Sequence, residues 1–196
     1  MITLVLLLLL GAEDVVERVV AIVDRQTITL VDVKHAAAIE IAKQVGSSVY
    51  ARPWPKGFLS EIRKHLMQRT LLLVEARRYS QQDPTDNEVE AVMNAFKSRF
   101  ENAKGFKRFL EQTLISEDEL RDDLRKSLYV DHFLSFRIRS RIEVPDQEDE
   151  AARQRAIDDE FLKRTLVFMR ELVDKAEVRI VGEMPEIQLA LPESQK

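Results

Sequence analysis

The side chains that could carry out catalysis are scattered through this sequence. The three histidines, His35, His65 and His132, never fall within one helical turn of each other, and no HExxH pair occurs. The five glycines are too far apart to build a phosphate-binding loop, no serine stands in a GxSxG turn, and there is no cysteine. The spacing therefore predicts neither a metal site nor a catalytic residue, and we expect no cofactor and no enzymatic activity.

The acidic clusters have a structural explanation. Ser116 and Glu119 have the spacing of a capping box, and the acids between them stand where the helix dipole favours negative charge. Thr85 and Glu88 repeat this spacing ahead of another apolar stretch. We therefore assign these carboxylates to helix starts rather than to acid–base chemistry.

Length and composition narrow the class of protein. The chain has 196 residues, of which 45% are hydrophobic and 33% charged, and a formal net charge of −4. This length suits a single domain, and the acidic balance argues against nucleic acid as a partner. The alternating Arg137, Arg139 and Arg141 stand near an expected helix end, where the dipole favours positive charge. Because glycine and proline are few, we expect a mainly helical fold.

An apolar run opens the chain. Residues 2–10 are apolar except for Thr3, and the small residues Gly11 and Ala12 follow. The run is shorter than the about 20 residues that span a bilayer, so we expect no stable membrane insertion. It suits the apolar core and cleavage end of a secretory signal peptide, although no basic residue precedes it. We expect residues 1–12 to be a signal peptide truncated at its basic end; the alternative is a buried strand.

The following pattern predicts a hairpin, a series of helices and a final strand. Residues 19–23 and 27–30 form two short β-prone runs joined by a brief polar turn. Residues 178–181 alternate as a strand, which must pair with the hairpin because so short a strand is unstable alone. Three- and four-residue apolar spacing predicts helices over residues 32–44, 58–79, 85–96, 106–113, 116–141 and 146–176.

Two of these helices carry specific expectations of burial. Residues 71–74 are apolar all round, which is typical of a fully buried section of helix. The last helix has a polar first half and an apolar stripe in its second half, which we expect to pack on the core. This stripe consists of Phe161, Leu162, Leu166, Met169, Leu172, Val173 and Ala176.

Aromatic side chains provide the candidate binding surface. Trp54 lies between Pro53 and Pro55 in a loop with charged neighbours, so we expect its indole to be hard to bury. Exposed aromatic residues rimmed by charge are typical of surfaces that contact peptides. The candidate peptide-binding residues are Trp54, Phe58, Phe106, Tyr129 and Phe133.

The order of these features resembles that of a known family, the SurA N-terminal domain. The likeness covers about residues 15–181, from the hairpin to the returning helix and strand. It departs from the family at the turn Asp24-Arg25 and at Val31, where the family tends to have Asn-Gly-like residues and serine. The segments that carry the resemblance are residues 16–24, 27–33, 66–76, 83–89, 116–121, 142–148 and 162–181.

This resemblance implies a mainly α, SurA N-terminal-like module with a small β-hairpin paired to a C-terminal strand. It implies one domain over residues 13–182, which includes the long helix 146–176, and we expect a loose tail over 183–196. The family comprises periplasmic chaperones for outer-membrane proteins, often fused to parvulin-type prolyl isomerases. A parvulin domain needs roughly a hundred residues after Pro145, and we expect no room for one.

The sequence thus predicts an exported, chaperone-like protein of the periplasm or cell envelope. It would hold unfolded or extended client polypeptides, of outer-membrane or secreted proteins, in a cradle between the helical core and the terminal helix. A prolyl isomerase, acting alone or with a partner subunit, and an envelope adaptor for one specific protein are the alternatives. The terminal helix could dock on its own chain or exchange between two copies in a domain-swapped homodimer.

Overall fold

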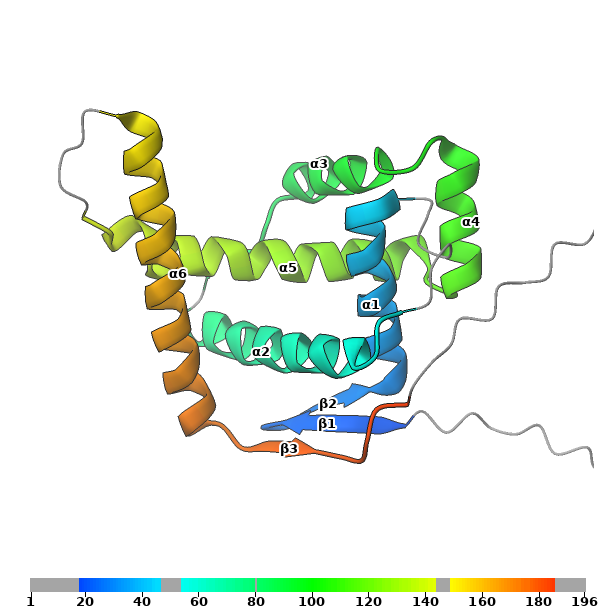
Figure 1. The fold of residues 1–196 in the computed structure, drawn as a ribbon, viewed down its shortest axis with the longest axis horizontal. Coiled ribbons are helices and arrows are strands. Elements are labelled where there is room, and N and C mark those ends of the chain that lie inside the picture. Colours follow the sequence, from blue (N-terminus) through cyan, green and yellow to red (C-terminus); the bar gives the residue numbers. More distant parts are fainter. Residues whose placement is uncertain (1–17, 47–53, 80, 144–148, 186–196) are drawn as a thin grey trace, which may run out of the picture.

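The computed structural model describes residues 18–46, 54–79, 81–143 and 149–185. It confirms a mainly helical fold with a small antiparallel sheet (Figure 1). The signal peptide expected at 1–12 and the tail beyond residue 185 lie outside the described residues. The elements are β1 (Val19–Val23), β2 (Gln26–Thr29), α1 (Leu30–Val45), α2 (Phe58–Arg78), α3 (Asp86–Lys97), α4 (Ala103–Thr113), α5 (Glu117–Arg137), the 3-10 helix η2 (Arg139–Arg141), α6 (Glu150–Lys175) and β3 (Val178–Ile180).

The sheet brings the first and last described elements together. Its strand order is β2-β1-β3 with both pairings antiparallel, so the final strand pairs with the hairpin as the sequence predicts. Asp24 ties the hairpin turn to β3: its N–H donates to the Glu177 carbonyl oxygen at 2.7 Å, and its carboxylate accepts from the Glu177 N–H at 3.0 Å. Asp24 has a φ of 52°, and Arg25 keeps a negative φ. The turn thereby spares Arg25 the left-handed conformation that a type I′ turn requires.

Capping residues set where the helices begin. Thr85 and Ser116 each form the predicted capping box with the glutamate three residues later. A third box, between Thr29 and Asp32, starts α1 at Leu30, two residues ahead of the predicted start. The hydroxyl of Thr29 accepts from the Asp32 N–H, so the helix begins directly after β2.

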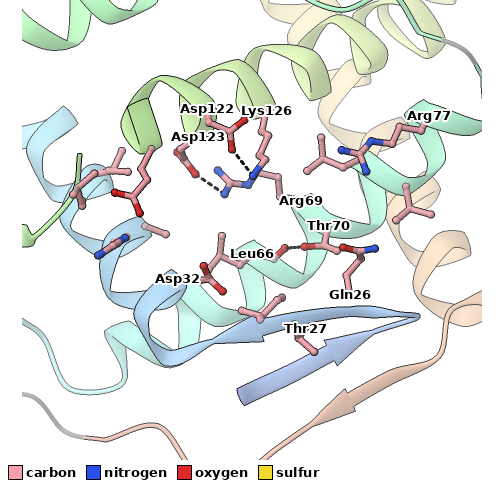
Figure 2. Close-up of a pocket in the computed structure, with 18 residues that line it drawn as sticks. Gln26, Thr27, Asp32, Leu66, Arg69, Thr70, Arg77, Asp122, Asp123 and Lys126 are labelled. Atoms are coloured by element: carbon pink, nitrogen blue, oxygen red, sulfur yellow. Dashed lines mark hydrogen bonds and ion pairs between the residues drawn. The ribbon is translucent and has the colours of Figure 1, made fainter. Parts of the chain in front are cut away.

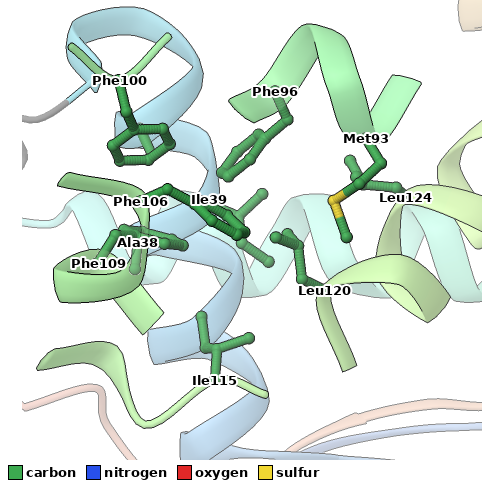
Figure 3. Packing of buried hydrophobic residues seen from close by; sticks show 11 residues of the cluster. Ala38, Ile39, Met93, Phe96, Phe100, Phe106, Phe109, Ile115, Leu120 and Leu124 are labelled. Carbon is green, nitrogen blue, oxygen red and sulfur yellow. The ribbon is translucent and has the colours of Figure 1, made fainter. Parts of the chain in front are cut away.

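Three apolar clusters hold these elements together. The sheet cluster joins β1 and β2 to α1 and α2, and includes Val20, Val33 and Ile62. The aromatic cluster joins α1, α3, α4 and α5, and its four phenylalanine rings lie with centroids 5.3–6.4 Å apart (Figure 3). The terminal-helix cluster joins α2 and α5 to α6, which therefore packs on its own chain; its fully enclosed members are Leu72, Ala76, Tyr129, Val130, Phe133, Leu134, Ile138, Met169 and Leu172.

The face that α6 buries differs from the predicted stripe. Met169 and Leu172 are buried as predicted, whereas Leu162, Leu166 and Val173 are 58%, 61% and 45% exposed. The helix crosses the ends of α2 and α5 on one side only (Figure 1), so part of its apolar surface finds no partner among the described residues. The sequence predicts an apolar half of this helix correctly, but not which side of it reaches the core.

The apolar section of α2 is only half enclosed. Leu71 and Leu72 are buried, but Leu73 and Val74 are half-buried, contrary to the prediction of burial all round. Both half-buried side chains line surface hollows described below. No helix in the described part of the chain is both long enough and apolar enough to cross a membrane.

Candidate functional site

Two adjoining hollows lie along the outer edge of β2. The first has a volume of about 330 Å³ and is bounded by β2, α1, α2 and α5. The second, of about 710 Å³, is bounded by the hairpin turn, α2 and α6. Gln26 and Val74 line both hollows, so the two form one depression, which we call the β2 groove. It is the candidate functional site.

The first hollow is polar, and four charged side chains on its α2 and α5 walls form ion pairs with one another. Arg69 on α2 contacts Asp123 on α5 at 2.6 Å, and Lys126 contacts Asp122 at 2.6 Å (Figure 2). Thr70, on the α2 wall, donates its hydroxyl proton to the Leu66 carbonyl oxygen of the same helix. Because these groups satisfy one another, a ligand in this hollow need not supply a particular charge.

The second hollow has a cluster of two aromatic rings and an arginine, of which Tyr79 is exposed and the other two are half-buried. The Arg137 guanidinium lies 5.0 Å from the ring centroid of Tyr79 and 5.8 Å from that of Phe168. Tyr79 is 51% exposed at the end of α2, so its ring is open to a ligand. The charges around the hollow are balanced: the acids are Asp24, Glu75, Glu171 and Glu177, and the bases are Arg25, Arg78, Arg137 and Lys175.

Two of the predicted site residues support this hollow from beneath. Phe133 is fully buried, and its ring lies 6.0 Å from Tyr79 and 6.1 Å from Phe168. Tyr129 is buried four residues earlier on α5 and donates its hydroxyl proton to the Gln81 carbonyl oxygen at 3.2 Å. Burial raises the pKa of Tyr129, so the phenol stays neutral and donates. In this conformation both rings pack in the core and neither offers a contact surface.

The other three predicted site residues lie elsewhere. Trp54 and Phe58 meet edge to face at 5.9 Å and are half-buried against the sheet cluster, at the far end of α2 from Tyr79. The indole of Trp54 is therefore turned partly into the core, although its place in a proline-flanked loop with charged neighbours predicts a side chain that is hard to bury. Phe106 is buried in the aromatic cluster. The structure thus brings together Trp54 with Phe58, and Tyr129 with Phe133, but not the five as one surface.

The groove residues Tyr79, Arg137 and Phe168 are absent from the sequence-based candidates. Phe168 could have been recognised, because it lies seven residues after Phe161 and four before Leu172, on the face of α6 that packs. Nothing in the local sequence marks Tyr79, which lies at the end of a helix. Its role depends on where α6 crosses α2.

The arginine series near the end of α5 also has a tertiary role. Arg139 pairs with Asp158 of α6 at 2.9 Å and lies 4.4 Å from the ring centroid of Phe161. Arg137 lies against Phe168, about two turns further along α6. These contacts fasten α6 to the core, so the arginines do more than complement the dipole of α5.

Among the residues that the structure describes, no other arrangement of side chains suggests chemistry. Within the described ranges, no three histidine, aspartate or glutamate side chains could hold a metal ion together. No protein-family model matches the chain, and a search of curated proteins finds no match either. The site is therefore defined by its geometry: an open groove beside a sheet edge, with balanced charge and an aromatic cluster at one end.

Proposed function

We propose that this protein is a chaperone-like holding protein that binds unfolded or extended polypeptide segments in the β2 groove. The observation that carries the proposal is the second hollow, an open cleft between the helical core and α6 with exposed Tyr79 at its rim. Aromatic rings and an arginine guanidinium offer contact area to many side chains. The balanced charge selects neither acidic nor basic segments, as a client-tolerant site requires.

The resemblance to the SurA N-terminal domain supports the same function. It covers residues 15–181 and consists in the order of a hairpin, capped helices and a returning strand along the sequence. Under this proposal the apolar run at residues 2–10 directs export. The protein then acts in the periplasm or cell envelope on outer-membrane or secreted clients.

The outer side of α6 favours one alternative, an adaptor for a specific envelope protein. Leu162, Leu166 and Val173 are exposed along one side of the helix, with Lys163 and Arg170 beside them. Exposed apolar residues in a row are typical of interaction surfaces. Capture of a single stoichiometric partner, lost in the double variant L162E/L166E, would favour the adaptor over a general holding protein.

Suppression of aggregation tests the proposed function. A urea-unfolded outer-membrane protein is diluted into buffer, and light scattering is followed with and without a molar excess of this protein. We expect suppression by the wild type, and at least threefold weaker suppression by the double variant Y79S/R137S, because it removes the open part of the aromatic cluster. The control is Phe136→Ser, an exposed residue of α5 that lines neither hollow. Unchanged aggregation with the wild type, or equal activity of the double variant and the control, would reject the proposal.

A further inference from the structure

The register of the sheet directs the main chain of one β2 residue into the groove. The Val181 N–H of the chain following β3 donates to the Val20 carbonyl oxygen at 3.0 Å, so the even-numbered residues of β1 form their hydrogen bonds on the β3 side. Thr27 stands opposite the even-numbered Ile22, and therefore lies at a non-hydrogen-bonded position of the hairpin. Its N–H and C=O consequently point away from β1, and neither has a hydrogen-bond partner among the described residues.

The groove extends to both sides of Thr27 along the strand. The first hollow lies beside Gln26, Thr27 and Ile28, and the second lies beside the turn residues just before them. On the α2 wall the lining runs from Leu66 to Tyr79, which is about 20 Å at 1.5 Å per residue. At about 3.3 Å per residue, an extended chain of about six residues covers this length.

We propose that a client segment binds by adding to β2 as a fourth strand, with its main chain hydrogen-bonded to the N–H and C=O of Thr27. This inference rests on the proposed function and specifies how the groove holds its client. Main-chain hydrogen bonds are the same for every residue type, so strand addition tolerates different client sequences. Alternate side chains of the segment enter the two hollows, where charges of both signs and the Tyr79 ring are available.

The shortness of the free edge suits reversible holding. Thr29 ends β2 with its N–H bonded to the Asp32 carboxylate, and its chain turns directly into α1. Only Thr27 therefore offers both main-chain groups, and a bound segment gains about two main-chain hydrogen bonds. Such an anchor releases its client readily, whereas a long edge would promote aggregation.

The position of the edge favours a single extended chain over a second copy of this protein. Thr27 is exposed, but α5 and α6 form the far walls of the hollows beside β2. A second copy would bring its own α5 and α6 to the same place, where they would meet these walls. One narrow strand with no helices of its own can reach Thr27.

The other free edge of the same sheet supplies a matched control. Ile180 of β3 stands opposite the odd-numbered Ala21, so its main chain also points outward from the sheet. It is 57% exposed and lines neither hollow. Proline at either position removes an outward N–H without breaking a hydrogen bond of the ladder.

Binding of a fluorescein-labelled ten-residue peptide of alternating valine and tyrosine, measured by fluorescence anisotropy, tests strand addition. We expect Thr27→Pro to weaken binding at least fivefold and Ile180→Pro to change it less than twofold. Circular dichroism and urea unfolding verify that both variants are folded. If the two variants bind the peptide equally well, strand addition is wrong.

Backbone N-methylation of the peptide provides a second measurement that does not depend on either variant. Methyl groups on every second residue block the donors along one edge of the bound strand. Two peptides are compared, one methylated on the odd-numbered and one on the even-numbered residues. We expect one of them to bind at least fivefold more weakly than the unmethylated peptide and the other to differ from it less than twofold. Equal binding of both methylated peptides and the unmethylated peptide would mean that side chains alone hold the segment, which overturns strand addition but leaves the proposed function standing.

Three further outcomes separate this inference from its alternatives. A wild-type dimer that Thr27→Pro dissociates would show that a second copy occupies the edge, and would reject the client segment as its occupant. If the wild type neither binds the peptide nor suppresses aggregation, the inference and the proposed function fail together. Suppression of aggregation without peptide binding rejects the inference alone.

Discussion

Among individual side chains, burial separates the aromatic residues that support the groove from those that line it. Phe133 is fully buried and contacts two rings of the groove, while Tyr79 is half open to solvent. Phe136, three residues along the same helix, is 62% exposed. Residue type alone therefore does not distinguish a buried supporting ring from an exposed one, because both positions carry phenylalanine.

Truncation of Phe133 tests its supporting role. We expect Phe133→Ala to lower the free energy of unfolding by about 3–5 kcal/mol, because it leaves a cavity beneath Tyr79 and Phe168. Phe136→Ala on the exposed side should change it by less than about 0.5 kcal/mol. Urea denaturation followed by far-UV circular dichroism measures both values. Similar losses for the two variants would contradict the packing described for Phe133.

Among the helices and strands, capping boxes couple helix starts to the ionisation of glutamates. Hydrogen bonds from the Ser116 hydroxyl and main chain lower the pKa of Glu119 below its ordinary value of 4.5. Thr85 lowers the pKa of Glu88 in the same way. The caps therefore work with ionised carboxylates.

Acid should weaken the capped helices. A carboxyl group whose pKa is lower in the folded than in the unfolded state binds fewer protons when folded, so its stabilisation is present above about pH 4.5 and is lost as the pH falls through the folded value. We expect the urea midpoint to fall below about pH 4.5, and Ser116→Ala to reduce that dependence along with a loss of about 1 kcal/mol at neutral pH. Ser135→Ala, an exposed serine within α5, is the control. An unaltered pH profile for Ser116→Ala would contradict the coupling.

At the scale of the whole molecule, α6 and β3 bring the end of the described chain next to its first strand. Leu172 is buried against α2 and α5, Arg139 pairs with Asp158, and β3 completes the sheet beside β1. The second hollow exists only while α6 is docked, because this helix forms one of its walls. The site therefore depends on packing between segments that are far apart in the sequence.

Substitutions on opposite sides of α6 test this dependence. Leu172→Ala should lower the free energy of unfolding by about 2–5 kcal/mol and speed hydrogen exchange in α6 and β3, since it removes a buried contact that holds the helix. Leu166 lies on the outer side of the same helix and is 61% exposed, so Leu166→Ala should change the free energy of unfolding by less than about 0.5 kcal/mol. Equal exchange rates in both variants would contradict docking of α6 through Leu172.

The candidate site was less predictable from sequence than the fold. Proline and charged residues surround Trp54 in the sequence and predict a side chain that is hard to bury, yet its ring lies partly against the sheet cluster. Phe106, Tyr129 and Phe133 occupy core positions, since aromatic residues on the apolar face of a helix are buried whenever that face meets a neighbour. Tyr79 and Thr27 carry no local signal at all.

The sequence by itself determined the elements, their order and the need for the last strand to rejoin the hairpin. Periodicity, capping boxes and the instability of a lone strand are properties of short segments, and Thr85, Ser116 and β3 follow them. Only the tertiary structure decided which face of α6 is buried and which main-chain groups of β2 remain free. Both depend on how helices cross and how strands align, which are contacts between separate elements and leave no periodic trace in the sequence.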